Sequence, residues 1–466
     1  MDHAVSEDAS YRDPAGRVYH LGNRVLRSVT GVGAADYEFI RDSGLLDELA
    51  SDGRLIGCME VDPGVLSDAP EVRYVLEHPR LSFVSYPYEW CFSALKTAAL
   101  LHLDLSLESL EWGATLSDAS AYNVQFQGTR PIFIDVLSFR RYRDGEYWFA
   151  HRQFLEQFLN PLLLTALRGV PFNVWFRGRL EGIPSNDLSA LLPWWRMFDW
   201  RVSAHVILPA RFQRSVTKID EDGVARIKAR SLPKHAFGSM LASLRRWIEG
   251  LESSLPRQSA WSDYAETNGY RALEAEAKTN FLRRFTAKVK PQHLWDIGCN
   301  AGHYAEVALE AGAKEVIGFD TDHGALEKAF ARASKGGLRL LPLYLDVADP
   351  SPGQGWRGIE RKALRDRANA DGLLALAVVH HLAIGRNLPL KDVVNWLIDL
   401  APQGVIEFVE KDDPCVQQML QFRNDIFPDY GREIFRATVL ARAAIIEEQE
   451  ITANRRLLVW YSRHDD

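Results

Sequence analysis

Cysteine is scarce and scattered in this sequence: 466 residues hold four cysteines, and no two of them form a Cys-x-x-Cys pair. Isolated thiols of this kind support neither a zinc ribbon nor a disulfide framework. We therefore expect a protein of a reducing compartment, with a cytoplasmic location. The cysteines are Cys58, Cys91, Cys299 and Cys415.

Long apolar runs and a strong excess of one charge are also missing. The most apolar windows, residues 159–167 and 372–379, are far shorter than the ~20 residues of a spanning helix, so we expect no transmembrane segment. The formal net charge of -7, from 55 basic and 62 acidic side chains, gives no general attraction to nucleic acid or to an anionic membrane. The N-terminal residues are acidic and polar, unlike a secretory or transit peptide.

The composition that is present belongs to a globular protein. Hydrophobic residues make up 47 % and charged residues 25 %, which excludes a disordered chain. At roughly 100 to 200 residues per domain, the length predicts two or three domains. We place a loose tail at residues 1–15, an α+β domain at 16–214, a linker with one helix at 215–259, and an α/β domain at 260–466.

Short β-rich runs alternate with helical ones from about residue 260 onward. This alternation predicts a doubly wound, seven-stranded Rossmann-like sheet with helices on both faces. Two last β-rich runs, residues 443–451 and 455–463, are joined by Thr452-Ala453-Asn454. Their short connection predicts an antiparallel pair at one edge of the sheet.

A glycine-containing turn follows the first strand of this half, in the sequence WDIGCNAGHY. Gly298 and Gly302 stand where the backbone must turn sharply into a helix and let a ligand approach. Asp296 lies on the strand, two residues before the first glycine. An acid at this point favours a cationic or amino-bearing ligand over the pyrophosphate of a dinucleotide.

Acids also end the next two strands. Asp320, eighteen residues after Gly302, stands where a carboxylate accepts both ribose hydroxyls, and Asp322 is the fallback for this role. Asp346 ends the third strand, in a position to accept a hydrogen bond from an adenine amino group. Each acid alone is also compatible with a helix cap or a turn, but three successive strand ends meet in one crevice.

This constellation resembles the class I S-adenosylmethionine-dependent methyltransferases, over residues 260–466. The resemblance implies S-adenosylmethionine as the cofactor. It implies that Asp320 binds the ribose hydroxyls and Asp346 the adenine. The implied loop for the cofactor's amino-acid part and ribose consists of Asp296, Gly298, Cys299, Asn300 and Gly302.

The fourth strand leads into His380 and His381, where methyltransferases of this class present residues to the methyl acceptor. A histidine there is a candidate base for a hydroxyl nucleophile. Alternatively, because adjacent residues of an extended strand face opposite ways, one histidine caps the next helix or bonds backbone. A metal site would need a third ligand near the pair; none is evident nearby, and we expect no metal in this half.

Two further features bear on the acceptor. Residues 410–413 follow the fifth strand at the rim of the crevice, and we interpret them as a solvated loop rather than as substrate contacts. An Asn-Pro-Pro-Tyr motif is absent after the fourth strand, which weakens a DNA base or a protein amide as acceptor.

The N-terminal half carries a second constellation, in LSDASAYNVQFQGTRPIFIDVLSF. Asp118 and Asn123 are five residues apart, and Asp135 ends the next strand, which resembles the catalytic loop and metal-binding Asp of kinases. The resemblance implies Asp118 as base and Asn123 and Asp135 as Mg²⁺ ligands, with ATP as the nucleotide. The departures are Leu116 in place of histidine, no Phe-Gly after Asp135, no glycine-rich phosphate loop, and no strand lysine, with only Arg27 nearby.

Across residues 16–462, motifs such as FVSYPYEWCFSALK, HRQFLEQFLNPLLL and VIEFVEKDDP resemble the NoeA-type host-specificity nodulation proteins of rhizobia and their bacterial relatives. The resemblance implies a methyltransferase with a degenerate kinase-like first half. Our leading hypothesis is O-methylation of a small-molecule or glycan-type acceptor, such as a nodulation signal or surface glycan. The alternatives are a kinase-like phosphotransferase or nucleotide-binding protein with an S-adenosylmethionine-sensing half, and a non-catalytic binding module. The oligomeric state stays open.

Overall fold

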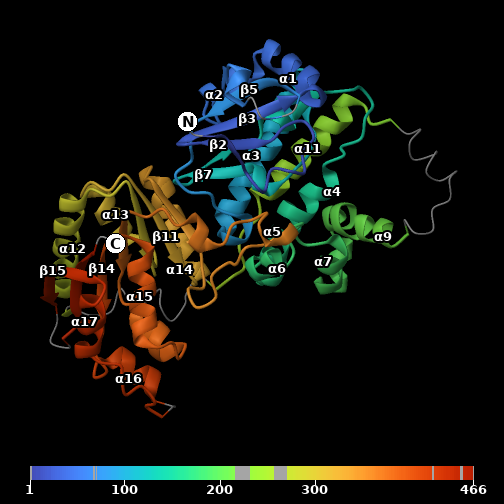
Figure 1. The fold of residues 1–466 in the computed structure, drawn as a ribbon. Coiled ribbons are helices and arrows are strands. Elements are labelled where there is room, and N and C mark those ends of the chain that lie inside the picture. The colour runs from blue at the N-terminus through green and yellow to red at the C-terminus, as the bar shows by residue number, and fades with distance from the viewer. Residues whose placement is uncertain are drawn as a thin grey trace. The chain divides into compact units, whose positions relative to one another are not determined.

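The computed structural model describes residues 3–66, 69, 71–215, 231–256, 270–421, 424–451 and 455–464. Its contacts divide the chain into two units (Figure 1). The N-terminal unit comprises Met1–Phe126, Arg130–Leu255 and Gly353–Lys362, and the C-terminal unit comprises Gln127–Thr129, Pro256–Pro352 and Ala363–Asp466.

A five-stranded antiparallel sheet opens the N-terminal unit, in the order β1-β2-β3-β5-β4. Its second and third strands form a hairpin, in which Leu21 pairs with Arg24 around Gly22, whose φ of 57° suits a tight turn. The strands are β1 (Val5–Ser6), β2 (Val18–Leu21), β3 (Arg24–Thr30), β4 (Met59–Val61) and β5 (Val72–His78), followed by the short pairs β6 (Ala114–Leu116) with β9 (Phe139–Arg141) and β7 (Val124–Gln127) with β8 (Arg130–Phe133).

Helices make up most of the rest of this unit, so its α+β character is as expected, while its kinase-like identity stays a prediction. The long helix α3 (Phe92–Glu111) is buried along much of its length and packs against α11 (Lys234–Glu249). The other helices are α1 (Gly31–Ser43), α2 (Leu45–Ser51), α4 (His151–Phe154), α5 (Asn160–Arg168), α6 (Asn173–Gly178), α7 (Ser185–Leu191), α8 (Trp200–Val202) and α9 (Leu208–Ser215).

The predicted boundaries at both ends of this unit differ from the structure. The expected loose tail is built into the sheet, since Val5 pairs with His20 and the Asp13 carboxylate lies 2.8 Å from Nη2 of Arg27. The helix of the predicted linker is α11, and Nε of Arg245 on it lies 2.5 Å from Oδ1 of Asp104 on α3. It therefore belongs to the N-terminal unit. Residues 216–230 and 257–269 of that linker lie outside the described residues.

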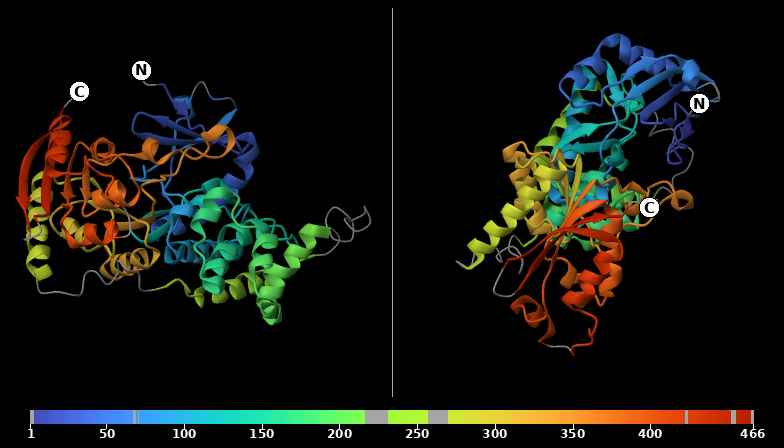
Figure 2. Two further views of the ribbon diagram at one scale, coloured as in Figure 1. Left: turned by 90° about the horizontal axis from the view of Figure 1, so that it is seen from below. Right: turned by 60° about the vertical axis from the view of Figure 1, so that its left-hand side comes forward.

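The C-terminal unit contains the predicted seven-stranded sheet, in the order β12-β11-β10-β13-β14-β16-β15. The first five strands in this order are parallel, whereas β16 is antiparallel to both its neighbours. The pair β15 and β16, drawn in red, lies at one edge (Figure 2); its connecting residues 452–454 lie outside the described residues. The strands are β10 (His293–Ile297), β11 (Glu315–Asp320), β12 (Leu340–Tyr344), β13 (Gly372–Ala375), β14 (Gln403–Phe408), β15 (Ala443–Glu450) and β16 (Leu457–Arg463).

The strand order also explains why helices cover both faces. The chain runs from β10 outward to β12, then returns to β13 and continues in the opposite direction to β14. Right-handed crossovers in two directions place their helices on opposite faces. Strands covered on both faces are mostly apolar, as β13 is throughout, whereas β10 also carries His293 and Asp296. The helices are α12 (Tyr270–Val289), α13 (His303–Glu310), α14 (His323–Gly336), α15 (Leu390–Leu400), α16 (Pro414–Leu420) and α17 (Arg432–Leu440).

The core of this unit is formed by α12, α13 and the sheet, with Phe281, Phe285 and Trp460 among its largest members. α15 packs against β13 and α17. In the part of the chain that the structure describes, every helix is too short or too polar to cross a bilayer.

Candidate functional site

A cleft opens where the strand order of the C-terminal sheet reverses. The parallel strands β10 and β13 are neighbours, and their connections leave in opposite directions. In open α/β sheets, ligands bind at such a switch point, beyond the carboxyl ends of the strands. A cleft of about 1280 Å³ lies there, lined by residues that follow β10, β11, β12 and β13.

The glycine turn after β10 is held against the neighbouring strand. The backbone N–H groups of Gly298 and Cys299 both donate to the carbonyl oxygen of Phe319, at 2.8 and 3.0 Å. Gly298 has a φ of 78°, and a Cβ on it would lie 2.5 Å from Cγ2 of Val378. A Cβ on Gly302, with a φ of 76°, would lie 2.8 Å from Leu340. The glycines are thus required by backbone conformation and packing, rather than by the approach of a ligand.

Asp296 is the most unusual side chain of the cleft. It is 1 % exposed, yet its Oδ2 has no hydrogen-bond partner among the described residues. Burial, and then the nearby carboxylate of Asp320, raise the pKa of Asp296 to about 7. A buried carboxylate without a partner is costly, so this position has an unmet need for a cation or a donor.

Asp320 differs from Asp296 because the chain itself holds its carboxylate. Oδ2 accepts from the backbone N–H of Asn300 at 2.8 Å, and Oδ1 accepts from that of Asp322 at 2.9 Å. Each oxygen keeps a second lone pair for a ligand. Burial raises the pKa of Asp320. Asp322 caps α14 by accepting from the N–H groups of Gly324 and Ala325, which is the helix-cap role.

Asp346 lines the same cleft, two residues beyond the end of β12 rather than on its last residue. Its Oδ2 lies 2.7 Å from Nη2 of Arg386, and its Oδ1 accepts from the N–H of Ala348 at 3.0 Å. The positive charge of Arg386, at the surface, compensates the carboxylate of Asp346. A ligand that binds this carboxylate would therefore share it with Arg386.

Cys299 lines the cleft and is buried. Burial, and then Asp320 and Asp296, raise the pKa of its thiol well above the usual value. The thiol packs so closely on Gly318 that a Cβ there would lie 2.9 Å from the sulfur. A neutral, packed thiol of this kind is not a nucleophile.

The two histidines do not lie on an extended strand. β13 ends at Ala375, and His380 has helical φ and ψ directly before the π-helical turn His381–Gly385. Both rings therefore line the cleft, with centroids 4.1 Å apart. Burial is the main cause that lowers the pKa of His380 and of His381. The expectation that the two must diverge was wrong, because it assumed strand geometry.

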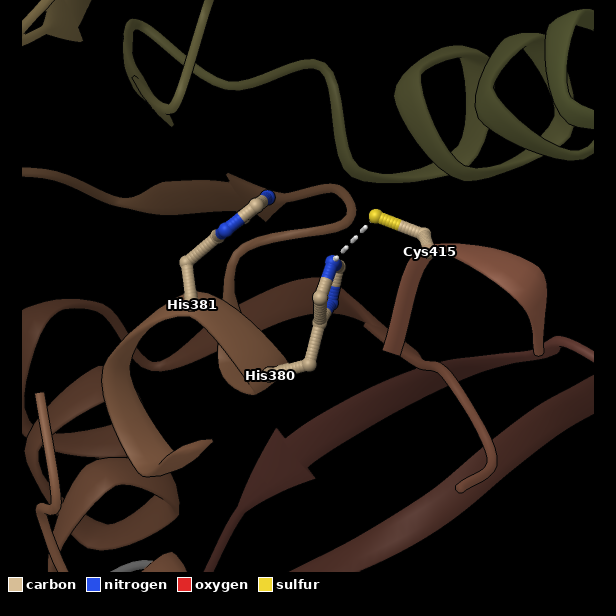
Figure 3. A group of neighbouring side chains, drawn as sticks. All are labelled: His380, His381 and Cys415. Carbon is tan, nitrogen blue, oxygen red and sulfur yellow. Dashed lines mark hydrogen bonds between the residues drawn. The ribbon is translucent and has the colours of Figure 1, made fainter. Parts of the chain in front are cut away.

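A third donor, which the sequence did not reveal, lies beside them. Sγ of Cys415, at the start of α16, is 3.7 Å from Nε2 of His380 (Figure 3). Ligand atoms of His380, His381 and Cys415 all lie within 4.8 Å of one another. The reason for excluding metal from this half, a missing third ligand, was therefore wrong. The only sign of this third ligand in the sequence is the tripeptide Asp413-Pro414-Cys415, which follows β14.

Two buried ion pairs border the histidines, and sequence reasoning missed them too. Nζ of Lys278 lies 2.7 Å from Oε1 of Glu407, and Nε of Arg456 lies 2.7 Å from Oδ2 of Asp413. Asp413, which we interpreted as part of a solvated loop, is fully buried. It also caps α16 by accepting from the N–H of Cys415 at 2.9 Å.

The acids of the N-terminal unit are brought together as their spacing predicted. Nδ2 of Asn123 lies 3.1 Å from Asp118 and 3.2 Å from Asp135, and the Ser138 hydroxyl oxygen lies 2.7 Å from Asp118 and 2.9 Å from Asp135. Burial, and then Asp135, raise the pKa of Asp118 to about 6.

The expected Mg²⁺ role does not fit this cluster. Nη1 of Arg27 lies 3.0 Å from Oδ1 of Asp135, where the kinase resemblance implied a metal ion. Every carboxylate oxygen of the two acids already accepts a hydrogen bond or ion pair from the chain. The N-terminal unit therefore gives no support to ATP with Mg²⁺ or to Asn123 and Asp135 as metal ligands.

Comparisons with known proteins found sequence relatives and similar solved structures. No family model matches the chain. The nodulation protein NoeA of Rhizobium meliloti (strain 1021) is 44 % identical over 457 residues, which are 98 % of this chain and 96 % of that protein. The ribosomal RNA large subunit methyltransferase E of Hyphomonas neptunium is 34 % identical over 79 residues, 17 % of this chain and 31 % of that protein.

Among solved structures, the N-methyltransferase NodS of Bradyrhizobium japonicum WM9 is 13 % identical with a TM-score of 0.32, covering 41 % of this chain and 97 % of that one. The match to NoeA spans nearly the full length of both proteins. The chain therefore belongs to the family of the nodulation protein NoeA.

Proposed function

We propose that this protein methylates a hydroxyl of a small-molecule or glycan-type acceptor in the cleft of the C-terminal unit. The observation that carries the proposal is the buried carboxylate of Asp296 at the switch point of the sheet, whose Oδ2 has no partner among the described residues. S-adenosylmethionine supplies an electrophilic methyl group on a sulfonium sulfur, and it also carries an amino group that this carboxylate can hold.

The residues around Asp296 suit the rest of the cofactor. Asp320 lines the cleft, and its carboxylate, held by backbone N–H groups, is assigned to the two ribose hydroxyls. Asp346 is assigned to the adenine amino group, shared with Arg386. The turn Gly298–Gly302, with Cys299 and Asn300, supplies backbone groups to the amino-acid part and the ribose.

The acceptor is assigned to the histidine end of the same cleft. Its volume of about 1280 Å³ exceeds the roughly 300–1,000 Å³ of common ligand sites, which leaves room for an acceptor beside the cofactor. His380 and His381 lie there and are the groups that assist removal of the hydroxyl proton. Holding the hydroxyl oxygen in line with the methyl group supplies much of the remaining acceleration.

Oxygen is favoured over nitrogen by the residues after β13. Methylation of an exocyclic amine calls for polar acceptors around the nitrogen, but Leu376, Ala377 and Val378 are apolar. The match to a nodulation protein supports a nodulation signal or a surface glycan as acceptor. We assign selection of the acceptor to the N-terminal unit, and we propose a cytoplasmic location. The kinase-like alternative has no such support, because its acids are compensated internally.

The test is transfer of radiolabelled methyl from S-adenosylmethionine to small-molecule and glycan fractions, with mass spectrometry to identify the methylated atom. We expect label in an O-methylated product with the unmodified protein and with Asp392→Asn, an exposed change on α15 outside the cleft. We expect no label with Asp296→Asn. Equal labelling by Asp296→Asn would contradict the proposal, as would an N-methylated product.

A further inference from the structure

The side chains of His380, His381 and Cys415 converge on one space at the acceptor end of the cleft. They come from two elements, the π-helical turn after β13 and the start of α16, and all three point into that space (Figure 3). His380 is 1 % exposed and Cys415 is 7 % exposed, while His381 is partly buried. Within the described residues, this is a set of three potential metal donors within 4.8 Å of one another.

The donor set selects the class of ion. Two imidazoles and a thiolate suit Zn²⁺ and similar borderline ions, and they do not suit Mg²⁺ or Ca²⁺, which require oxygen ligands. With Zn–N of about 2.05 Å and Zn–S of about 2.3 Å, tetrahedral ligands lie about 3.6 Å apart. The distance from Nε2 of His380 to Sγ of Cys415 is 3.7 Å. This pair already has the spacing of two zinc ligands.

The surroundings give two further reasons to expect an ion. Nδ1 of His380 is buried and has no partner among the described residues, so the hydrogen-bonding need of the ring is unmet on that side, while Nε2 contacts Sγ of Cys415. The cations of Lys278 and Arg456 are each compensated by a buried carboxylate, Glu407 and Asp413. The space between the donors therefore lies next to two ion pairs of no net charge rather than next to unpaired cations.

We propose that His380, His381 and Cys415 bind one Zn²⁺ ion and leave its fourth position open to the cleft. Cys415 gives up its thiol proton on binding, so that a thiolate coordinates the ion. Three protein ligands with one open position are the arrangement of catalytic rather than structural zinc.

The open position gives the ion a role in the proposed methyl transfer, and this second step rests on the proposed function. An acceptor hydroxyl that binds there loses its proton to solvent more readily, because the ion stabilises the alkoxide. The oxygen then forms a bond to the methyl carbon, the carbon–sulfur bond breaks, and sulfur keeps the electron pair. In this account the histidines assist removal of the hydroxyl proton as ligands of the ion, and they do not accept the proton themselves.

The test of binding uses the untagged full-length protein, stripped with a chelator and then titrated with Zn²⁺ alone or Co²⁺ alone. We expect one equivalent of Zn²⁺ per chain, and with Co²⁺ the thiolate-to-metal charge-transfer absorption and strong visible bands of a four-coordinate site. Cys415→Ser and His381→Gln should weaken Zn²⁺ binding at least 100-fold. Cys58→Ser, a change at a partly buried thiol of the N-terminal unit, should bind Zn²⁺ as the unmodified protein does.

Substoichiometric Zn²⁺ binding by the unmodified protein would overturn the proposal, as would a Co²⁺ complex without thiolate absorption. The Co²⁺ spectrum of the unmodified protein keeps the test valid even where Cys415→Ser fails to fold. Titration of the stripped protein with S-adenosylmethionine separates this proposal from the proposed function, because cofactor binding at Asp296 does not require the ion. Methyl transfer that survives in Cys415→Ser would show that the histidines act without metal.

Discussion

The two acidic clusters of this protein have similar residues but opposite electrostatic balance. In the N-terminal unit, the carboxylates of Asp118 and Asp135 are fully engaged by Asn123, Ser138 and Arg27. In the C-terminal unit, Asp296 is more deeply buried and has an oxygen with no partner among the described residues. The first cluster is complete within the chain, and we propose that a ligand completes the second.

This difference shows which property of a buried acid indicates a ligand site: its hydrogen-bond partners, rather than its pKa. Burial raises the pKa of Asp118 to about 6 and that of Asp296 to about 7, so a perturbed pKa alone does not distinguish them. The partners do, because a carboxylate that already has its donors gains little from a ligand, whereas an unpaired one gains much.

The largest expected effect comes from removing the charge of the unpaired acid. Asp296→Asn should weaken S-adenosylmethionine binding at least about 30-fold, because a buried, hydrogen-bonded charge pair contributes about 2–5 kcal/mol. Isothermal calorimetry with the unmodified protein and with Asp392→Asn as the matched control checks this. A loss of less than threefold would mean that the cofactor's amino group is held elsewhere.

The same acid should make the ligand-free protein sensitive to pH. The pKa of Asp296 is about 7 in the folded state and about 3.9 when unfolded. Between these values only the unfolded chain loses the proton, so stability falls as pH rises from about 4 to about 7. Asp296→Asn should therefore be more stable than the unmodified protein at pH 8, by about 4 kcal/mol for a pKa difference of about three units, and equal to it near pH 4.

Urea unfolding of both proteins at several pH values measures this difference, because the other titrating groups cancel in the comparison. Parallel stability curves for the two proteins would show that Asp296 finds a partner that removes the cost of its burial.

A change in the cluster of Asp118 and Asp135 should alter the stability of the protein and not its binding of a ligand. Arg27→Met removes the cation beside Asp135 and Asp13 and should lower the free energy of unfolding by about 1–2 kcal/mol, since the pair is partly exposed. Thermal melts with ATP and Mg²⁺ should show no stabilisation of the unmodified protein. A shift of several degrees with ATP and Mg²⁺ would revive the kinase-like interpretation.

The smallest effect is expected where an acid is compensated at the surface. Arg386 is 55 % exposed in its pair with Asp346, and exposed pairs contribute about 0.2–1 kcal/mol. Arg386→Met should change unfolding by less than about 1 kcal/mol, and cofactor affinity less than threefold. A tenfold loss of affinity would assign Arg386 itself to the ligand.

The cofactor end of the site could be predicted because its determinants are local in sequence. Gly298 and Asp296 belong to one turn, and Asp320 lies at the end of the next strand along the chain. A strand–turn–helix pattern therefore contains most of the geometry. Asp346 was placed correctly in the cleft, although β12 ends two residues earlier.

The acceptor end could not be predicted because it depends on long-range packing. Cys415 meets His380 across 35 residues, and Lys278 meets Glu407 across 129 residues. Nothing in the apolar run before the histidines shows that β13 stops at Ala375. Because β13 ends there, both histidine rings lie on a helical turn and face Cys415. The expectation that no third metal ligand lies near them was wrong for this reason.

The measurement that tests the central claim most directly is calorimetric titration with S-adenosylmethionine at pH 6, 7 and 8, for the unmodified protein and Asp296→Asn. As the Asp296 carboxyl ionises around pH 7, the affinity of the unmodified protein should rise with pH, by up to about tenfold per unit below the pKa. The affinity of Asp296→Asn should be weak and nearly constant. Equal affinities for the two proteins at every pH would contradict the claim that an unpaired carboxylate holds the cofactor.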